Sequence, residues 1–215
     1  MLRPEAEIEL PRSLAAVESV RPGLPLALPW RGCDATGAEL FLRQGVRRDA
    51  VPYGEFLRTI LHETPYMLQG PMDRLPEAPE QREFLEQLHA LPNCICIVAV
   101  RFGRGAGREP ILGSLVLLGG QTPRTRHAAQ LSMGVCQSEW GRGLGGRLLD
   151  AGVSWARANP RLRRVGLQVY TGNVAARRLY TTRGFHEEGV LTRDVRDEQG
   201  WDDLVGMGLD LGVSP

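Results

Sequence analysis

The sequence contains no lysine, because all 26 of its basic residues are arginines. The protein therefore carries no side-chain amine. It also lacks an apolar run near the ~20 residues that a membrane-spanning helix needs. The first residues, MLRPEAEIEL, carry charges where a signal peptide requires an apolar stretch. These absences predict a cytoplasmic protein that does not contact a membrane.

Charge imbalance and metal-binding patterns are also missing. The formal net charge is +1, so no overall field attracts the chain to DNA. The four cysteines are Cys33, Cys94, Cys96 and Cys136, and no second pair has the spacing of zinc ligands. We therefore expect reduced thiols and no metal site. A content of 42% hydrophobic and 24% charged residues is typical of a soluble globular protein.

The chain divides into a proline-rich arm, residues 1–36, and one domain, residues 37–212. The arm holds five prolines and no sustained periodicity, which predicts an extended segment. In the domain, alternating apolar residues predict strands and apolar residues at helical spacing predict helices. The expected strands cover 39–43, 94–101, 111–118, 127–135, 163–170, 185–194 and 201–211; the expected helices cover 49–64, 79–91, 143–158 and 173–183, and a glycine-rich hairpin connection covers 102–109.

Four glycines, Gly141, Gly143, Gly145 and Gly146, lie between an expected strand and an expected helix. Glycines at such a junction let backbone N–H groups approach a ligand, and the helix N-terminus adds the positive end of a dipole. The segment therefore predicts an anion-binding loop. A Walker loop is excluded, because Arg147 follows Gly146 where that motif requires Lys.

The same glycines also match the dinucleotide fingerprint G-x-G-x-x-G. No Asp or Glu lies between Asp150 and Glu187, so the acid that binds the ribose of NAD is missing, while several arginines leave NADP open. A dinucleotide fold usually begins with this fingerprint, whereas here several strands precede it. The arginines also suit the phosphates of coenzyme A, or RNA. An NADP-binding Rossmann-type oxidoreductase remains the alternative enzyme.

Two motifs in the second half resemble those of the GNAT superfamily of N-acetyltransferases. The pyrophosphate motif [Q/R]-x-x-G-x-[G/A] corresponds to residues 140–145, with Trp140 in the Gln or Arg position. The segment LQVYTGNVAARRLYTTRGF follows the family's strand, Asn, helix, Leu-Tyr and Gly-Phe order. This order runs through Val169, Asn173, Ala176, Leu179, Tyr180, Gly184 and Phe185.

This resemblance implies a mixed α/β fold of the GNAT type. We expect a mostly antiparallel sheet of about seven strands, with one splayed parallel pair and helices on both faces. The implied reaction transfers the acetyl group of acetyl-CoA to a primary amine, on a protein N-terminus or a small molecule, by direct attack in a ternary complex. A non-catalytic CoA-binding module is a further alternative. The resemblance also leaves a homodimer open, because dimers are common among relatives.

The resemblance also implies the site residues. The expected cofactor-binding residues are Met133, Val135, Gly141, Arg142, Gly143, Leu144, Gly145, Gly146, Asn173 and Tyr180. Tyr180 is the expected general acid, because a phenol with a pKa of roughly 10 stays protonated at neutral pH. Related sequences carry Glu at the position of Gln130, so the base is sought elsewhere. His127 and Glu63 are the candidates.

Overall fold

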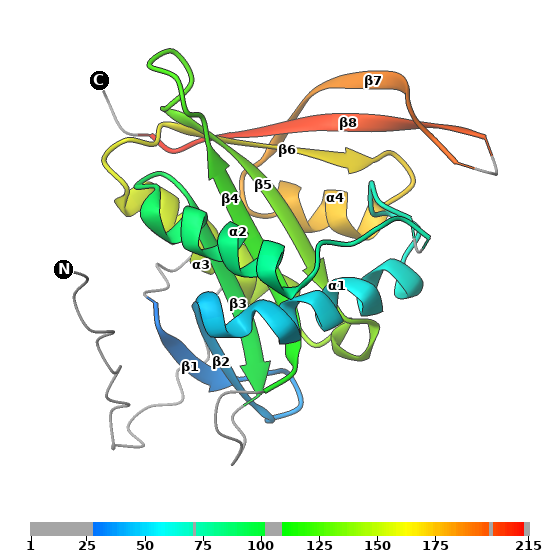
Figure 1. Ribbon diagram of the computed structural model, residues 1–215. Helices are drawn as coiled ribbons and strands as arrows, with labels where there is room; N and C mark the ends of the chain where they lie inside the picture. The colour runs from blue at the N-terminus through cyan, green and yellow to red at the C-terminus, as the bar shows by residue number, and fades with distance from the viewer. Residues whose placement is uncertain (1–27, 71, 102–108, 198–199, 213–215) are drawn as a thin grey trace.

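The computed structural model describes residues 28–70, 72–101, 109–197 and 200–212. Its centre is one eight-stranded sheet with the order β1-β2-β3-β4-β5-β6-β8-β7 (Figure 1). The strands are β1 Trp30–Cys33, β2 Glu39–Gln44, β3 Ile95–Arg101, β4 Ile111–Gly119, β5 Ala128–Val135, β6 Arg164–Tyr170, β7 His186–Arg196 and β8 Trp201–Asp210. The helices are η1 Arg47–Asp49, α1 Ala50–Glu63, α2 Ala78–Ala90, η2 Gln137–Glu139, α3 Leu144–Ala158 and α4 Val174–Thr181.

One pair of strands in this sheet is parallel, and it separates along its length. β5 and β6 pair from Ala128 with Arg164 to Gln130 with Gly166. Beyond that row β5 continues to Val135 and β6 to Tyr170, and the two strands diverge (Figure 1). All other neighbours are antiparallel. The predicted mixed sheet with a splayed parallel pair is confirmed, and we call the diverging ends, residues 131–135 and 167–170, the wedge.

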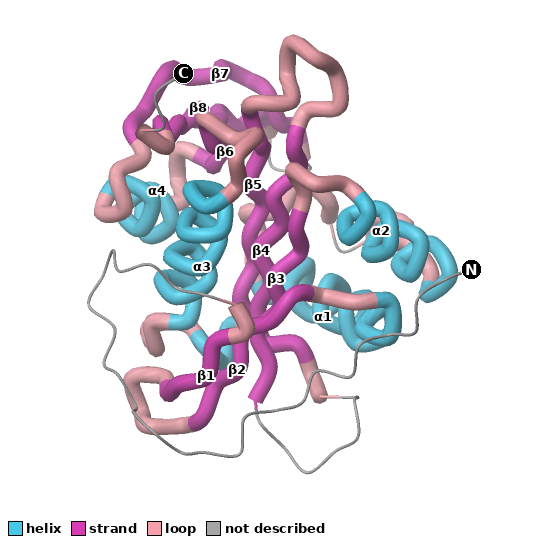
Figure 2. Tube along the Cα trace, turned by 90° about the vertical axis from the view of Figure 1, so that its left-hand side faces the viewer, coloured by secondary structure: helices cyan, strands magenta, loops and turns pink. Residues whose placement is uncertain are grey.

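Helices cover both faces of the sheet, as predicted. Figure 2 shows α3 and α4 on one side and α1 and α2 on the other. Each pair buries its own apolar cluster. On the first face, Leu148 and Leu149 of α3 and Tyr180 of α4 pack on alternate residues of the central strands. On the second face, Phe56 and Ile60 of α1 pack with the opposite residues of β3 and β4.

Local signals explain where the helices begin and end. Glu80 caps α2 by accepting a 2.8 Å hydrogen bond from the Glu77 N–H. The side chain of Asn173 accepts a hydrogen bond from the Ala176 N–H and so caps α4. Gly184, with φ 88°, supplies the left-handed residue after α4. The elements therefore begin and end within a few residues of the predicted bounds.

Two predictions concern the chain before and between the strands. The predicted arm includes β1, which pairs antiparallel with β2. β1 is the one strand of the sheet that is additional to the seven predicted ones. Residues 1–27 of the arm lie outside the described residues. The predicted hairpin joins β3 and β4, which do pair antiparallel, but residues 102–108 of its connection lie outside the described part of the chain.

Candidate functional site

The glycine loop joins η2 to α3 and presents a set of backbone N–H groups. Gly141 and Gly143 have φ values of 73° and 83°, the left-handed region that favours glycine. Gly143 is the N-cap of α3 and offers no side chain to the helix. The N–H groups of the first helical turn have no carbonyl within the helix to bond. With the dipole of α3 behind them, they form a site suited to an anion.

The surroundings of these glycines leave room in front of the loop. A Cβ added at Gly141 or Gly143 would meet no atom within 4 Å in the described structure. A Cβ at Gly145 would lie 3.4 Å from the Leu179 side chain of α4, and one at Gly146 would collide with the guanidinium of Arg183. The first two glycines are therefore required for backbone conformation and the last for contact with neighbouring side chains.

The backbone of β5 turns alternate residues toward the wedge. The Cys136 N–H donates to Leu112 on the β4 side, whereas the His127 carbonyl accepts from the Arg163 N–H on the β6 side. Because strand residues alternate, odd-numbered residues of β5 direct their N–H and C=O groups toward β6. Met133 and Val135 are odd-numbered and lie beyond the last β5–β6 pair. Their backbone groups therefore border the wedge.

The Trp140 side chain forms a hydrogen bond with one of these backbone groups. Its indole Nε1 donates a 2.8 Å hydrogen bond to the Val135 carbonyl, and 49% of the residue remains exposed. The bond ties the start of the glycine loop to the end of β5. Trp140 thus performs a structural task at the position where the family has Gln or Arg.

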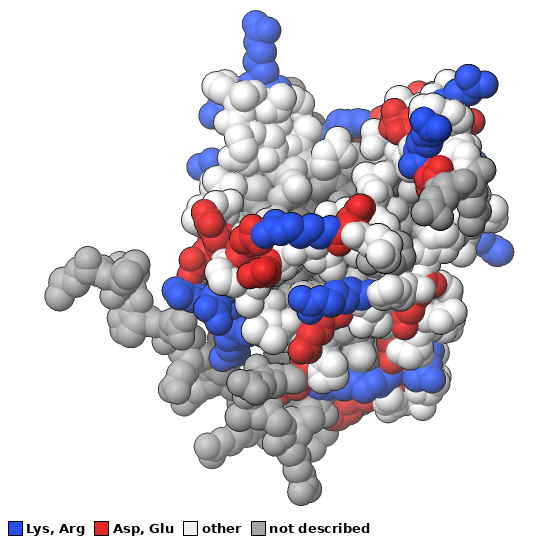
Figure 3. Space-filling view, turned by 45° about the vertical axis from the view of Figure 1, so that its right-hand side comes forward, with Lys and Arg blue, Asp and Glu red and all other residues white. Residues whose placement is uncertain are grey.

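Three arginines of the acid-free segment form ion pairs with acids at its ends or beyond it. Arg183 Nε lies 3.0 Å from Asp150 Oδ1 of α3, and Arg177 Nη2 lies 2.6 Å from Glu187 Oε1 of β7. Arg164 pairs with Glu188. Basic and acidic side chains are interspersed on the face in Figure 3. This distribution accords with the net charge and does not favour a nucleic-acid surface on that face.

Tyr180 and Asn173 lie at opposite ends of α4. Tyr180 is 6% exposed and packs on Phe185, with ring centroids 5.8 Å apart. Burial raises the pKa of Tyr180 to about 12, so its hydroxyl is neutral over the physiological range. Asn173 Oδ1 accepts the Ala176 N–H at 3.1 Å. That oxygen is engaged in the helix cap, which leaves the amide N–H₂ of Asn173 for a ligand.

The two candidate bases lie at opposite ends of β5. His127 is exposed just before the strand, and Glu63 lies at the end of α1, where its Oε2 accepts a 2.7 Å hydrogen bond from the Gln137 N–H. Eight strand residues separate these ends by roughly 25 Å. The structure therefore does not bring His127 and Glu63 together. Glu63 also helps hold η2, which leads into the glycine loop.

The sequence did not indicate the carboxylate of Glu188. It lies on the same face of the sheet as α1, beyond the part that α1 covers. β7 bulges at Glu188, between the pairs Glu187 with Met207 and Gly189 with Gly206. The Glu188 carboxylate pairs with Arg164 above Gly208, where a Cβ would collide with both side chains. The hydrogen bonds from Arg164 lower the pKa of Glu188, although burial opposes them. A bulge has no sequence signature, so only the fold reveals this placement.

The last residue of α1 and the four residues after it, residues 63–67, are bonded to both sides of the wedge at its open end. At the β5 end, Glu63 accepts the Gln137 N–H. At the β6 end, the Tyr66 hydroxyl donates to the Gly172 carbonyl, and the Tyr170 hydroxyl donates to the Met67 carbonyl, both at 3.2 Å. The rings of Tyr66 and Tyr170 also pack with centroids 5.7 Å apart. We call residues 63–67 the bridging segment.

Fold and loop together define a class, the acyltransferases with a splayed sheet and a glycine loop, and comparison with known proteins gives the family. Residues 57–185 match the Acetyltransferase (GNAT) family, and the chain belongs to it. A GNAT-family acetyltransferase from Streptococcus pneumoniae is 31% identical, with a TM-score of 0.74 over 80% of this chain and 99% of that one.

Two more distant structures share the fold. The ribosomal-protein-alanine N-acetyltransferase from Brucella melitensis is 20% identical, with a TM-score of 0.66 over 79% of this chain and 98% of that one. A phosphinothricin acetyltransferase from Sinorhizobium meliloti, solved in complex with acetyl-CoA, is 18% identical, with a TM-score of 0.68 over 82% and 92%.

No group of three or more His, Cys, Asp or Glu side chains in the described ranges is placed to hold a metal ion. None of the helices in the described part of the chain combines the length and apolar character needed to cross a bilayer.

Proposed function

We propose that the protein is an N-acetyltransferase that moves the acetyl group of acetyl-CoA to a primary amine by direct attack in a ternary complex. The observation that carries the proposal is the continuity of two backbone surfaces. The free N–H groups at the start of α3 suit a pyrophosphate, and the β5 edge beyond its last pair with β6, where Met133 and Val135 lie, leads away from them. On that edge the Val135 carbonyl already accepts the Trp140 indole N–H. Pyrophosphate and pantetheine follow one another in the same order in coenzyme A.

Each predicted cofactor residue has a task in this arrangement. Gly141, Arg142, Gly143, Leu144, Gly145 and Gly146 would hold the pyrophosphate through backbone N–H groups. Met133 and Val135 would pair with the pantetheine arm as a neighbouring strand does. The Asn173 amide and the Tyr180 hydroxyl would reach the same arm from α4. The acetyl-CoA complex of the Sinorhizobium meliloti enzyme, which shares this fold, supports the proposal.

The chemistry needs one acid and one base. The amine nitrogen attacks the thioester carbonyl carbon, a C–N bond forms, the C–S bond breaks, and the departing sulfur takes a proton. Tyr180 supplies this proton, since its hydroxyl is neutral and forms no hydrogen bond with the described residues. The burial that raises the pKa of Tyr180 also disfavours a thiolate beside it, so proton transfer between the two is less uphill than the pKa of the phenol alone suggests.

The base removes a proton from the acceptor amine. β5 carries Gln130 where related sequences have a carboxylate, and this favours a weakly basic amine as the acceptor. At neutral pH an α-amine with a pKa of about 8 costs roughly 1.4 kcal/mol to deprotonate, whereas a lysine-type amine costs over about 4 kcal/mol. Gln130 cannot accept a proton. A protein N-terminus or a small α-amine is therefore the preferred acceptor, with His127 or Glu63 as the base. The proposed enzyme acts in the cytoplasm through its domain of residues 37–212.

An acceptor screen tests this function. Purified protein is incubated with acetyl-CoA and a panel of peptides with free N-termini, amino acids, polyamines and aminoglycosides, and release of the free thiol is measured. We expect thiol release with at least one α-amine and tight acetyl-CoA binding by calorimetry. Binding of acetyl-CoA without turnover would favour a non-catalytic CoA-binding module. Binding of NADPH in its place would favour the oxidoreductase and contradict the proposal.

A further inference from the structure

The turn between β1 and β2, residues 34–38, makes direct contact with the glycine loop. The Ala35 N–H donates a 3.2 Å hydrogen bond to the Arg142 carbonyl. Arg142 in turn donates its N–H to the Glu139 carbonyl at 3.3 Å. The peptide groups on both sides of Arg142 are therefore held. Neither the turn nor β1 falls within residues 57–185, which match the family.

The bond from Ala35 determines the direction of the next N–H in the loop. In a trans peptide the C=O of one residue and the N–H of the following residue point in opposite directions. Because the Arg142 carbonyl points to Ala35, the Gly143 N–H points away from the turn. Gly143 has a φ of 83°, and a Cβ there would meet no atom within 4 Å in the described structure. Its N–H makes no backbone hydrogen bond within the described residues.

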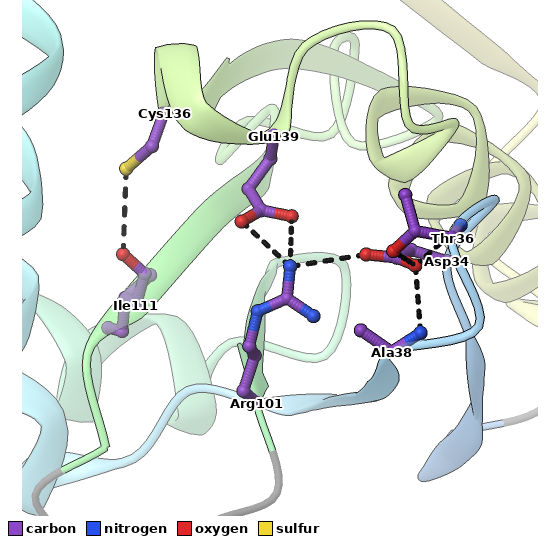
Figure 4. Close-up of polar contacts among 7 residues, drawn as sticks. All are labelled: Asp34, Thr36, Ala38, Arg101, Ile111, Cys136 and Glu139. Carbon is purple, nitrogen blue, oxygen red and sulfur yellow. Dashed lines mark hydrogen bonds and ion pairs between the residues drawn. The ribbon is translucent and has the colours of Figure 1, made fainter.

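An ion network with two buried carboxylates and a partly exposed guanidinium holds the turn in place (Figure 4). Asp34 Oδ1 accepts hydrogen bonds from the Thr36 N–H, the Thr36 hydroxyl and the Ala38 N–H at 2.8, 2.6 and 3.0 Å. Its Oδ2 lies 3.1 Å from Arg101 Nη2. The same nitrogen lies 2.9 and 2.7 Å from the two carboxylate oxygens of Glu139. Arg101 thus links the turn to η2, immediately before the loop.

We expect this network to contribute little to the net stability of the fold. Asp34 and Glu139 are 5% and 4% exposed, so two carboxylates are desolvated against one guanidinium. Buried ion pairs of this kind often contribute little net stability, and their best-attested use is to fix one arrangement of the chain. Burial alone would raise the pKa of Asp34, but the hydrogen bonds from Thr36, Ala38 and Arg101 hold it below its ordinary value. Asp34 therefore stays charged at neutral pH.

We propose that the β1–β2 turn is a working part of the anion site: Ala35 orients the Gly143 N–H, and the Asp34–Arg101–Glu139 network positions Ala35. The inference rests on the proposed function, because the anion in question is the pyrophosphate of coenzyme A. Ala35, Asp34 and Arg101 are positioning residues that need not touch it.

The chain offers a substitution that removes only the critical donor. Ala35 is exposed and is the second residue of the turn that the Gly37 N–H closes on the Asp34 carbonyl. Proline is favoured at that position and has no N–H. Ala35→Pro should therefore keep the turn and delete the bond to Arg142. Ala35→Ser retains the N–H and is the matched control.

The test measures CoA affinity by calorimetry and thermal stability by calorimetric scanning for the wild type, Ala35→Pro and Ala35→Ser. We expect Ala35→Pro to weaken CoA binding about tenfold with little change in Tm, and Ala35→Ser to bind within about twofold of the wild type. The Arg142 N–H, which donates to the Glu139 carbonyl, should also exchange faster with solvent in Ala35→Pro. Unchanged CoA affinity in folded Ala35→Pro overturns the inference. A wild type that fails to bind CoA overturns the proposed function instead.

Asp34→Asn provides a second variant if Ala35→Pro does not fold. The amide oxygen can still accept the three turn bonds, whereas the charge facing Arg101 is lost. Removing a negative charge near an anion site should strengthen CoA binding if charge alone matters. We expect a loss of about fivefold instead, because the turn is no longer held by Arg101. Equal or tighter binding by Asp34→Asn contradicts the positional role.

Discussion

At the scale of single residues, the site combines groups with visible sequence signals and groups without any. Tyr180 follows from its motif, and the structure adds that it is buried with a raised pKa. In the sequence, Trp140 is only a departure from the motif. The structure adds its hydrogen bond to the Val135 carbonyl, which ties the start of the glycine loop to the end of β5. The two residues test different steps, chemistry and binding.

Tyr180→Phe keeps the ring and its packing on Phe185 and deletes the hydroxyl proton. We expect kcat to fall by about a hundredfold or more while the KM for acetyl-CoA changes little, as for an interaction made mainly in the transition state. Steady-state kinetics with the acceptor from the screen measures both. An unchanged kcat would mean that solvent protonates the thiolate. A rise in KM alone would assign the hydroxyl to binding.

Trp140→Arg restores the residue type of the family motif. The guanidinium can also donate to the Val135 carbonyl and adds a forked donor near the phosphates. We expect acetyl-CoA affinity to stay the same or improve, measured by calorimetry. Trp140→Leu, which has no donor, serves as the control and should bind less tightly. A tenfold loss in Trp140→Arg would show that the packing of the indole is essential.

At the scale of elements, the sequence predicted the strands and helices well because their signals are local. The strand expected over 163–170 is β6 Arg164–Tyr170, and the helix expected over 143–158 is α3 Leu144–Ala158. Three features were missed: β1, the bulge at Glu188 and the bond from Ala35 to Arg142. β1 has only four residues and none of them is fully buried, so it shows no apolar alternation. The bulge lies inside a strand that periodicity does predict, and the bond from Ala35 to Arg142 joins segments far apart in the chain, which periodicity does not report. The two predicted bases, His127 and Glu63, lie apart because the length of β5 separates them.

Gly143→Val tests the glycine loop as an element. Gly143 adopts a φ of 83°, which a β-branched residue rarely tolerates, so the loop must change its backbone to accept valine. We expect CoA binding to be abolished, as measured by calorimetry. Gly212→Val is the matched control: Gly212 has a φ of 68° and likewise has no atom within 4 Å of an added Cβ in the described structure, but it lies beyond β8. It should bind CoA normally. Unchanged affinity in Gly143→Val would contradict the pyrophosphate assignment.

At the scale of the whole molecule, the two parts of the sheet depend on a shared core. β5 and β6 share only three register pairs, so backbone pairing between the parts is limited. The apolar cluster beneath α3 and α4 contains residues of both parts, among them Leu115 of β4, Leu148 of α3 and Val205 of β8. Packing on this face therefore joins what the wedge separates.

Leu148→Ala tests this coupling. Leu148 is 0% exposed and lies against Gly113 of β4, so its truncation leaves a cavity in the shared core. We expect the free energy of unfolding to fall by about 2 to 5 kcal/mol, measured by urea denaturation, with one cooperative transition. Val190→Ala, at a residue that is 54% exposed, should change it by less than about 0.5 kcal/mol. Two separate transitions would show that the parts fold independently.

The geometry of the wedge also limits aggregation of the protein by strand pairing between copies. An unpaired strand edge ordinarily invites a strand of another chain and so promotes aggregation. Here the two unpaired edges face each other inside one sheet, closed at one end by the pairs up to Gln130 with Gly166 and crossed at the other by the bridging segment. A second polypeptide cannot lie along them without breaking these bonds. The wedge can therefore keep backbone groups available for recognition without itself offering a template for fibre growth.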